Sequence, residues 1–365
     1  RWGSNNSFHA HVGMDYTWHA EQSQKNGEPG YIWLDNARFR GRMKDGYRDD
    51  DANVAGFNPC VEQQLEDAEL CCLVETFPAK HEDYNDYLST LKIAYMYGKT
   101  VTLVNTHWPE TNGIMLKNRR IGLSQSGVVQ AFNKFGRRTL FNWCDDAYEE
   151  VKKLDKMYSD WFAIPRSIKT TSVKPSGTVS LLAGATPGLH YPESRFYTRR
   201  IRISVNSELI EPLKKAGYKI EPAFGSEDST LVVEVPVDVG EGIRTAAELS
   251  IWEQFSLAAF LQRHWADNQV SCTVTFDPET EGKEIPFVLN YFQYHLKGIS
   301  LLPRHDYGAY PQMPYEAIEE KEYNKQVKKL GKLSFGVIHN EEAEVDKFCN
   351  NDSCEIPGED LTSEN

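Results

Sequence analysis

Residues 269–303, QVSCTVTFDPETEGKEIPFVLNYFQYHLKGISLLP, contain the pattern that decides the fold. The first segment, QVSCTVTF at 269–276, is rich in apolar and β-branched residues, which predicts a strand. IPFVLNYFQYHLKG at 285–298 predicts a helix, and GISLLP at 298–303 predicts a second strand. A helix between two apolar strands is typical of a parallel sheet covered by helices. This stretch therefore predicts an α/β fold.

The same alternation of strands and helices extends toward the N-terminus. Strands are predicted at 100–104, 121–127, 167–173, 200–205 and 229–237. Helices are predicted at 84–97, 147–161, 207–217 and 246–265. Gly98 is expected to end the first of these helices, and Asn206 and Gly217 to bound the third. The first sixty residues have weak periodicity, so we expect irregular structure there around a few strands and assign no helix.

The composition describes a folded chain with room for a large core. A length of 365 residues corresponds to two or three small domains or to one large α/β barrel. Forty Lys and Arg residues against 53 Asp and Glu residues give a net charge of −13, which argues against binding to nucleic acid through the overall field. No run of 18 apolar residues occurs, which argues against a membrane-spanning segment.

The seven cysteines are an odd number and a low density for a disulfide scaffold. We therefore expect a reducing, cytoplasmic environment in which the thiols act individually. The chain begins at Arg1 instead of Met and shows no signal segment, so we expect a truncated or processed end.

The heptapeptide FNPCVEQ at 57–63 places Asn58, Cys60 and Glu62 at alternate positions. In an extended chain these side chains point to one side, so an amide, a thiol and a carboxylate would share a small volume. A thiol can act as a nucleophile or a hydrogen-atom donor, and a carboxylate beside it can act as a general base. From spacing alone, a buried cysteine in an Asn-Pro turn is the preferred alternative.

Two further groups of cysteines differ in their surroundings. Cys71 and Cys72 are neighbours that cannot easily form a disulfide with each other, and no CxxC spacing supports a zinc site, so we predict no metal. Cys349 and Cys354 lie in the acidic segment CNNDSC, which has almost nothing apolar to bury. A flexible dithiol can carry electrons to a disulfide elsewhere, so we interpret this pair as a redox shuttle. Two incidental surface thiols are the alternative.

The segment KPSGTVSLLAGATPG at 174–188 combines small residues with hydroxyls, among them Ser176, Gly177, Thr178 and Ser180. Small residues let backbone N–H groups approach an anion closely, and hydroxyls add donors, which suits a phosphate group. The segment lacks both the GK[ST] ending of the Walker motif and the dinucleotide-binding fingerprint. A plain turn before a solvated basic strand is the alternative.

Several segments, in this order along the chain, resemble the catalytic subunit of ribonucleotide reductases. The resemblance is specifically to the adenosylcobalamin-dependent ribonucleoside-triphosphate reductases of class II. The segments are RWGSNNS, NPCVEQ, RRIGLSQSG, KPSGTVSLLAGATPGLHYP, FYTRRIRI, NQVSCTVTF, GAYPQMPYE and CNNDSC. Several of them are long and individually specific, so the resemblance does not depend on one motif.

The resemblance implies a role for each candidate residue. Cys60 matches the cysteine that becomes a thiyl radical, Glu62 the carboxylate that takes the proton of the substrate 3′-hydroxyl, and Asn58 an amide that holds the ribose hydroxyls. Cys71 matches one of two cysteines that deliver electrons and form a disulfide, whereas its neighbour Cys72 has no counterpart.

Two more sets of residues acquire roles in the same way. Cys349 and Cys354 match a C-terminal pair that reduces the active-site disulfide and is regenerated by thioredoxin. The substrate-phosphate loop is matched by Ser176, Gly177, Thr178, Val179 and Ser180.

The implied architecture is the C-terminal half of a ten-stranded α/β barrel, with Cys60 on a central finger loop and a flexible tail. Residues 1–325 would form the partial barrel, and residues 326–365 the region with the redox-active CxxxxC tail. The family's chain is far longer, so the first barrel strands, the deoxynucleotide effector site and the partner of Cys71 would lie in an N-terminal part outside this sequence. We therefore expect this chain alone to be inactive.

The implied activity is reduction of ribonucleoside triphosphates to 2′-deoxyribonucleoside triphosphates, with adenosylcobalamin as cofactor, thioredoxin as reductant and a monomeric enzyme. A class I large subunit is one alternative, but it needs two adjacent tyrosines near the C-terminus, and Tyr307 and Tyr310 are not adjacent. A glycyl-radical enzyme is disfavoured because no RVxGY-like segment occurs. A non-catalytic nucleotide-binding or redox module is the third alternative.

Overall fold

The computed structural model describes residues 6–304 and 312–334. The chain forms two compact units, one of Arg1–Tyr191 with Ala247–His305 and the other of Pro192–Ala246 with Asp306–Asn365. Every predicted site residue within the described ranges belongs to the first unit. The two candidate shuttle cysteines, Cys349 and Cys354, lie outside the described residues.

Most strands of the first unit connect into one series. A four-stranded sheet has the order β1 (Ser7–Ala10), β2 (Gly30–Trp33), β11 (Gly298–Pro303) and β10 (Thr273–Phe276). A separate pair consists of β5 (Leu73–Thr76) and β6 (Gly122–Gln125). Single bridges from Leu123 to Thr171 and from Val173 to Val270 place residues 171–173 between β6 and the segment that leads into β10.

Neighbouring strands of this series are parallel, except for β11 and β2, which are antiparallel. The helix α10 (Ile285–Phe292) connects the parallel strands β10 and β11. The strand–helix–strand unit predicted from residues 269–303 is therefore confirmed, and so is the α/β class of this unit.

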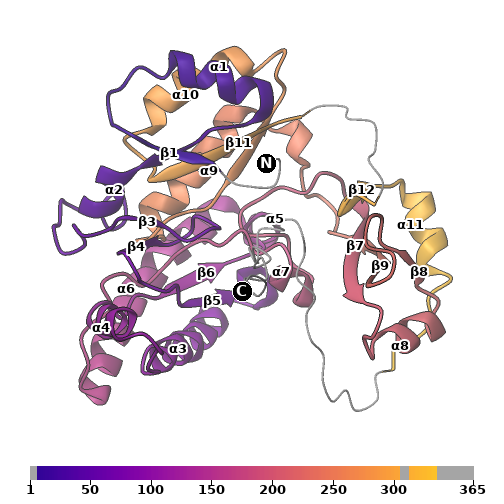
Figure 1. Ribbon diagram of the computed structural model, residues 1–365, viewed down its shortest axis with the longest axis horizontal. Coiled ribbons are helices and arrows are strands. Elements are labelled where there is room, and N and C mark those ends of the chain that lie inside the picture. Colours follow the sequence, from indigo (N-terminus) through magenta and orange to yellow (C-terminus); the bar gives the residue numbers. More distant parts are fainter. Residues whose placement is uncertain (1–5, 305–311, 335–365) are drawn as a thin grey trace, which may run out of the picture. The chain divides into compact units, whose positions relative to one another are not determined.

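Helices accompany these strands, and several of them contribute apolar residues to one core. They are α1 (Thr17–Asn26), α2 (Leu34–Phe39), α3 (Tyr84–Val101), α4 (Pro109–Asn118), α5 (Val128–Phe135), α6 (Arg137–Phe162), α7 (Val179–Leu182) and α9 (Ile251–His264). Short 3₁₀ turns occupy Pro78–Lys80, Ala246–Glu248 and Gly282–Glu284. Figure 1 shows α1 beside β11 and α10, and α3 beside β5. Tyr87 and Leu91 of α3, Leu140 of α6 and Phe255 of α9 are fully buried in the shared core.

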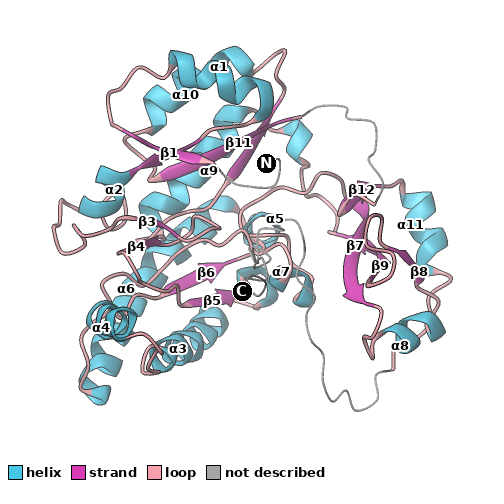
Figure 2. Ribbon diagram, viewed as in Figure 1, coloured by secondary structure: helices cyan, strands magenta, loops and turns pink. Residues whose placement is uncertain are grey.

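The second unit is an antiparallel sheet with two short helices (Figure 2). The sheet order is β12 (Tyr315–Ala317), β7 (Phe196–Ser204), β9 (Thr230–Asp238) and β8 (Lys219–Pro222), and the helices are α8 (Ile210–Lys215) and α11 (Glu320–Val327). The sequence correctly predicts strands at 200–205 and 229–237, but its expectation of a parallel sheet is wrong for them. The turn between β8 and β9 is too short for a parallel crossover. Arg200 and Glu234 also face each other across β7 and β9 as an ion pair.

Other local predictions need correction. Residues 100–104 are not a strand, because α3 continues through Gly98 to Val101 and a turn follows. Gly98 lies inside the helix, at a point where a Cβ would meet Val74 Cγ2 at 3.0 Å. Its small size therefore permits close packing of the helix against Val74. The helix predicted at 147–161 begins at Arg137 instead.

The N-terminal region also differs from the prediction. The first sixty residues contain two helices, α1 and α2, which the sequence pattern missed because most of α1 is polar. The helix predicted at 207–217 is shorter, since it begins at Ile210 and no side chain caps it. Among the described residues, no helix is long and apolar enough to cross a membrane.

Candidate active site

The FNPCVEQ segment forms the tip of a short hairpin, which we call the finger hairpin (residues 56–65). Its two strands are β3 (Gly56–Phe57) and β4 (Gln64–Leu65), which pair antiparallel. Asn58 stabilises the tip, because its Oδ1 accepts hydrogen bonds from the backbone N–H groups of Glu62 at 3.1 Å and Gln63 at 2.9 Å. Val61 has a φ of 59°, a strained conformation for a β-branched residue. The tip is thus a defined turn.

Side chains from the main strand series hold this tip in place. The Ser172 hydroxyl donates to the Glu62 carbonyl oxygen at 2.7 Å, and the backbone N–H of Gln269 donates to the same oxygen at 3.2 Å. The Ser271 hydroxyl donates to the Cys60 carbonyl oxygen at 2.6 Å. The backbone at and just after the candidate thiol is therefore fixed to residues 172 and 269–271.

Glu62 is a fully buried carboxylate with few partners. Neither of its oxygens has a hydrogen-bond partner in the described part of the chain. Burial raises the pKa of Glu62 above its usual value, although the nearby Lys174 ammonium and Asn58 amide oppose this shift. A carboxylate with a raised pKa and unused oxygens is suited to accept a proton from a bound molecule.

Lys174 faces both reactive groups of the finger hairpin. Its Nζ lies 3.5 Å from Glu62 Oε1 and 3.9 Å from Cys60 Sγ. Cys60 itself is partly exposed. Sequence reasoning placed Lys174 at the start of the predicted phosphate loop but gave it no role. The available signal was its position directly after the strand predicted at 167–173.

The structure distinguishes Cys71 from Cys72. The Cys72 thiol is buried and donates to the Gly98 carbonyl oxygen at 3.6 Å, and burial raises its pKa to about 11. Cys71 is exposed. Surrounding protein atoms, and then the Glu62 carboxylate, raise the pKa of Cys71, whereas Lys174 lowers it. Cys71 therefore shares the electrostatic environment of Glu62 and Lys174, and Cys72 belongs to the core.

The predicted phosphate loop is a tight turn that leads into the short helix α7. Ser176 has a φ of 56° and is fully buried, and its hydroxyl oxygen has no hydrogen-bond partner among the residues described. Its carbonyl oxygen accepts from the Ser180 backbone N–H at 3.3 Å. Thr178 and Val179 are exposed. The loop thus combines a fixed, unused hydroxyl with an open rim.

Gly188 fixes the other end of this loop. It has a φ of 47°, and a Cβ at this position would lie only 2.5 Å from the Lys174 carbonyl oxygen. Its N–H donates to the Ser126 hydroxyl at 3.0 Å. The two ends of the 174–188 segment therefore meet next to the lysine that faces the finger hairpin.

The remaining cysteines have structural positions. Cys144 and Cys272 are buried, as predicted, and burial raises the pKa of each to about 12. Within residues 6–304 and 312–334, no group of three or more His, Cys, Asp or Glu side chains is arranged to hold a metal ion. Of the predicted site residues, the structure brings Asn58, Cys60 and Glu62 together with Lys174.

Comparison with solved structures defines the class of protein. A crystal structure of a B12-dependent (class II) ribonucleotide reductase matches 90% of this chain and 50% of its own length, with a TM-score of 0.82 and 34% sequence identity. The class Id ribonucleotide reductase alpha subunit of Actinobacillus ureae matches 80% of this chain with a TM-score of 0.57 and 17% identity, which shows the fold alone. The described fold is that of a ribonucleotide reductase catalytic chain. No family model matches the chain.

Curated relatives identify the family within this class. A probable adenosylcobalamin-dependent ribonucleoside-triphosphate reductase of Dictyostelium discoideum is 54% identical over 361 residues, which are 97% of this chain and 47% of the relative. The corresponding reductase of Euglena gracilis is 52% identical, over 97% of this chain and 49% of its own length. Over 97% of its length the chain is similar to adenosylcobalamin-dependent ribonucleoside-triphosphate reductases. It spans about half the length of these relatives.

Proposed function

We propose that this chain carries the radical cysteine, the general base and the substrate-phosphate loop of an adenosylcobalamin-dependent ribonucleoside-triphosphate reductase. The reaction is reduction of a ribonucleoside triphosphate to the 2′-deoxyribonucleoside triphosphate, a DNA precursor. One observation carries the proposal: the finger hairpin presents a thiol, Cys60, and a buried carboxylate, Glu62, to the same lysine. Such a pair suits removal of a hydrogen atom and a proton from neighbouring positions of one ribose.

Cys60 acts on the C3′ hydrogen of the ribose. As a thiyl radical, its Sγ takes the 3′-hydrogen atom, which restores the thiol and leaves a radical on the substrate. Adenosylcobalamin, when bound, supplies the radical that removes the thiol hydrogen atom. The partial exposure of Cys60 fits this requirement, because a fully buried thiol could not be reached by a separate bound group.

Glu62 acts as the base for the substrate 3′-hydroxyl. Its oxygens accept no hydrogen bond within the described ranges, although Lys174 lies 3.5 Å from Oε1, so they can accept that proton, and the raised pKa of Glu62 lets it hold the proton once transferred. Loss of the 2′-hydroxyl as water follows, helped by the same carboxyl group. Asn58 positions this carboxylate through the two backbone hydrogen bonds at the hairpin tip, and it holds the ribose hydroxyls.

Cys71 supplies electrons together with a second cysteine from outside this chain. The two thiols lose two electrons and two protons and become a disulfide, while the substrate is reduced. Cys349 and Cys354 then reduce that disulfide by thiol–disulfide exchange, and thioredoxin regenerates them. The shared electrostatic environment of Cys71 and Glu62 supports the assignment of Cys71 over Cys72.

The triphosphate binds on the loop of Ser176, Gly177, Thr178, Val179 and Ser180. The buried Ser176 hydroxyl, which lacks a partner within the described ranges, supports this assignment, because a bound phosphate oxygen would accept its hydrogen bond. Lys174 precedes this loop by two residues, and its Nζ lies 3.9 Å from Cys60 Sγ, which supports binding of the phosphates near the finger hairpin.

The remaining parts of the proposal concern the whole enzyme. We place the deoxynucleotide effector site in the part of the family's chain that this sequence does not cover, and we expect a monomeric enzyme in a reducing, cytoplasmic compartment. The division into a catalytic part, 1–325, and a tail region, 326–365, stays a prediction. This chain alone is expected to be inactive.

The test is a chimera in which the Dictyostelium discoideum relative supplies the half that this chain does not match. Deoxynucleotide formation should depend on added adenosylcobalamin and require no second protein. Cys60→Ser should abolish it, whereas Cys272→Ser, a change in a buried cysteine outside the site, should retain most of it. Full activity of Cys60→Ser would disprove the proposal, and activity only with a separate radical protein would disprove the cofactor assignment.

A further inference from the structure

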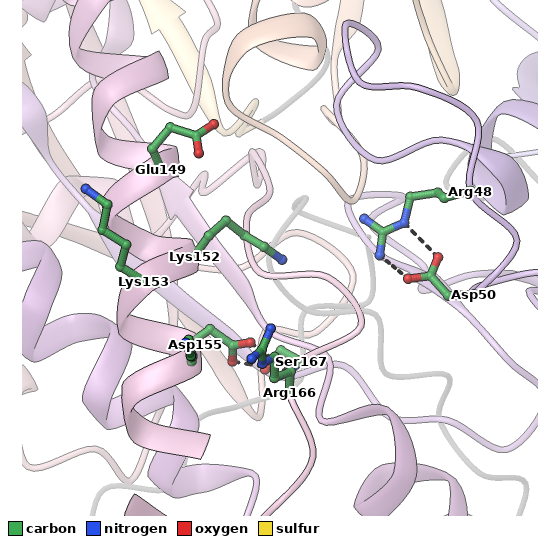
Figure 3. A pocket seen from close by; sticks show the side chains of 9 residues that line it. Arg48, Asp50, Glu149, Lys152, Lys153, Asp155, Arg166 and Ser167 are labelled. Atoms are coloured by element: carbon green, nitrogen blue, oxygen red, sulfur yellow. Dashed lines mark hydrogen bonds and ion pairs between the residues drawn. The ribbon is translucent and has the colours of Figure 1, made fainter. Parts of the chain in front are cut away.

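A charged pocket lies in the first unit, and no residue of the finger hairpin lines it. It has a volume of about 390 Å³ and opens between helix α6, the loop at 48–50 and the loop at 166–167 (Figure 3). Its walls consist of charged side chains and one serine: Arg48, Asp50, Glu149, Lys152, Lys153, Asp155, Lys156, Arg166 and Ser167. Neither Lys174 nor any residue of the proposed substrate-phosphate loop lines the pocket.

Each acidic side chain of the pocket already has a cationic partner. Asp50 Oδ1 accepts from Arg48 Nε at 2.7 Å, and Glu149 Oε1 pairs with Arg42 at 2.9 Å. Asp155 Oδ1 pairs at 2.8 Å with Lys99, a buried lysine behind the wall. The carboxylates are therefore not available to neutralise the other cations of the pocket.

Three cations of the wall lack such a partner. Among the described residues, Lys156 and Arg166 form no hydrogen bond and no ion pair. Lys152 forms neither, but it has a cation–π contact with Tyr148 at 6.0 Å, and its charge lowers the pKa of the buried Asp267. Lys153, in contrast, pairs with Glu150. The wall thus carries five cationic side chains against three acidic ones, in a chain whose net charge is −13.

Helix electrostatics do not explain this arrangement. Lys152 and Lys156 are four residues apart on α6, where like charges repel each other. The helix macrodipole favours cations only in its last turn, and α6 continues to Phe162. A bound anion would offset the repulsion. Cations from two chain segments commonly bind one phosphate group together.

The composition of the wall indicates which anion fits. No aliphatic or aromatic side chain lines the pocket, so it offers no surface on which a nucleobase could stack. We propose that this pocket binds the polyphosphate group of a phosphate-bearing ligand, held by Lys152, Lys156 and Arg166, at a site separate from the proposed substrate-phosphate loop. Any base or sugar attached to the phosphates would remain outside the pocket.

Isothermal titration of the 365-residue chain with inorganic tripolyphosphate at low salt tests this proposal. Lys152→Met and Arg166→Met should each weaken binding at least tenfold. The matched control Lys153→Met, on the same helix turn but paired with Glu150, should change it less than twofold. ATP should bind no more tightly than tripolyphosphate. Melting temperatures without anion confirm that each variant is folded.

The Ser176–Ser180 loop is a second phosphate site under the proposed function, so the titrations are repeated in a Ser176→Ala background. Binding that still depends on Lys152 and Arg166 there belongs to the pocket. The measurement needs no turnover, so it holds whether or not the proposed reaction is correct. The assignment would be overturned if all variants bound tripolyphosphate equally, or if Lys153→Met lost as much affinity as Lys152→Met and Arg166→Met. It would also be overturned if ATP bound but tripolyphosphate did not, or if hexaglutamate displaced bound tripolyphosphate at a concentration below that of tripolyphosphate itself.

Discussion

Lys174 and Glu62 form an ion pair of 3.5 Å in which the carboxylate is fully buried and the lysine side chain is 12% exposed. The two residues come from different parts of the chain, the finger hairpin and the start of the phosphate loop. Lys174 opposes the rise in the pKa of Glu62 that burial causes. The lysine therefore determines how readily the carboxylate carries its charge.

Replacing Lys174 should change the pH dependence of the proposed reaction. Without the ammonium, the pKa of Glu62 rises further, so the basic form needed to accept a proton appears only at higher pH. Lys174→Met in the chimera should shift the acid limb of the pH–rate profile upward, and Lys174→Arg should largely restore it. An unchanged acid limb in Lys174→Met would show that the lysine does not act on Glu62.

Glu62 itself should reduce the stability of the fold at neutral pH. Its folded-state pKa is raised, so the native state holds a proton more tightly than the unfolded state, and stability falls as pH rises from the usual glutamate pKa through the raised value. Glu62→Gln removes this loss and should raise the free energy of unfolding at pH 8 by on the order of 1 kcal/mol. Urea denaturation at pH 8 and pH 5 measures it. The gain should be smaller at pH 5, and a variant less stable than wild type at pH 8 would contradict this expectation.

Asn58 should matter for stability as well as for activity. Asn58→Ala removes the acceptor of two buried backbone N–H groups, those of Glu62 and Gln63, and should cost about 1–3 kcal/mol in the free energy of unfolding. Asn85→Ala, an exposed change on α3, is the matched control and should cost much less. Equal effects of the two substitutions in urea denaturation would contradict the role of Asn58 at the tip.

The cysteines should differ in their reaction with iodoacetamide in the native state. Cys60 and Cys71 are accessible, whereas Cys72, Cys144 and Cys272 are buried. Mass spectrometry of the labelled protein should find Cys71 modified long before Cys72. Because the pKa of Cys71 is raised, its rate should still increase as pH rises above the usual thiol value. Faster modification of Cys72 would reverse the assignment.

Gly188 should tolerate no side chain. Gly188→Ala places a methyl group 2.5 Å from the Lys174 carbonyl oxygen and demands a φ of 47°, so it should destabilise the chain by about 1–3 kcal/mol and displace Lys174. Gly113→Ala, inside α4 with no atom within 4 Å of the added Cβ, is the matched control and should be neutral or stabilising. Thermal unfolding of both variants measures the difference. Similar melting temperatures would mean that the loop adjusts freely.

Local sequence patterns predicted those helices, strands and site residues that depend only on neighbouring positions in the chain. The strand at 121–127 and the helix that begins at Tyr84 follow from periodicity, and the grouping of Asn58, Cys60 and Glu62 follows from three positions within five residues. Gly98 misled the prediction, because a glycine can end a helix or permit close packing inside it, and only the position of Val74 decides between the two.

Contacts between distant residues could not be predicted in this way. Lys174 is 114 positions from Cys60, and no local pattern indicates that its side chain reaches the finger hairpin. For Cys71 and Cys72, alternation along an extended chain predicts that the two thiols face opposite sides, but not which one faces the core. The packing of Cys72 against Gly98 decides this.

The anchoring of the finger hairpin also determines when the site can form during synthesis. The Glu62 carbonyl is held by Ser172, 110 positions later, and the Cys60 carbonyl by Ser271, 211 positions later. Both contacts close long loops, which is a slow, late step in folding. A nascent chain therefore has no anchored thiol until residue 271 has left the ribosome, so the tip is completed only after most of the first unit is in place.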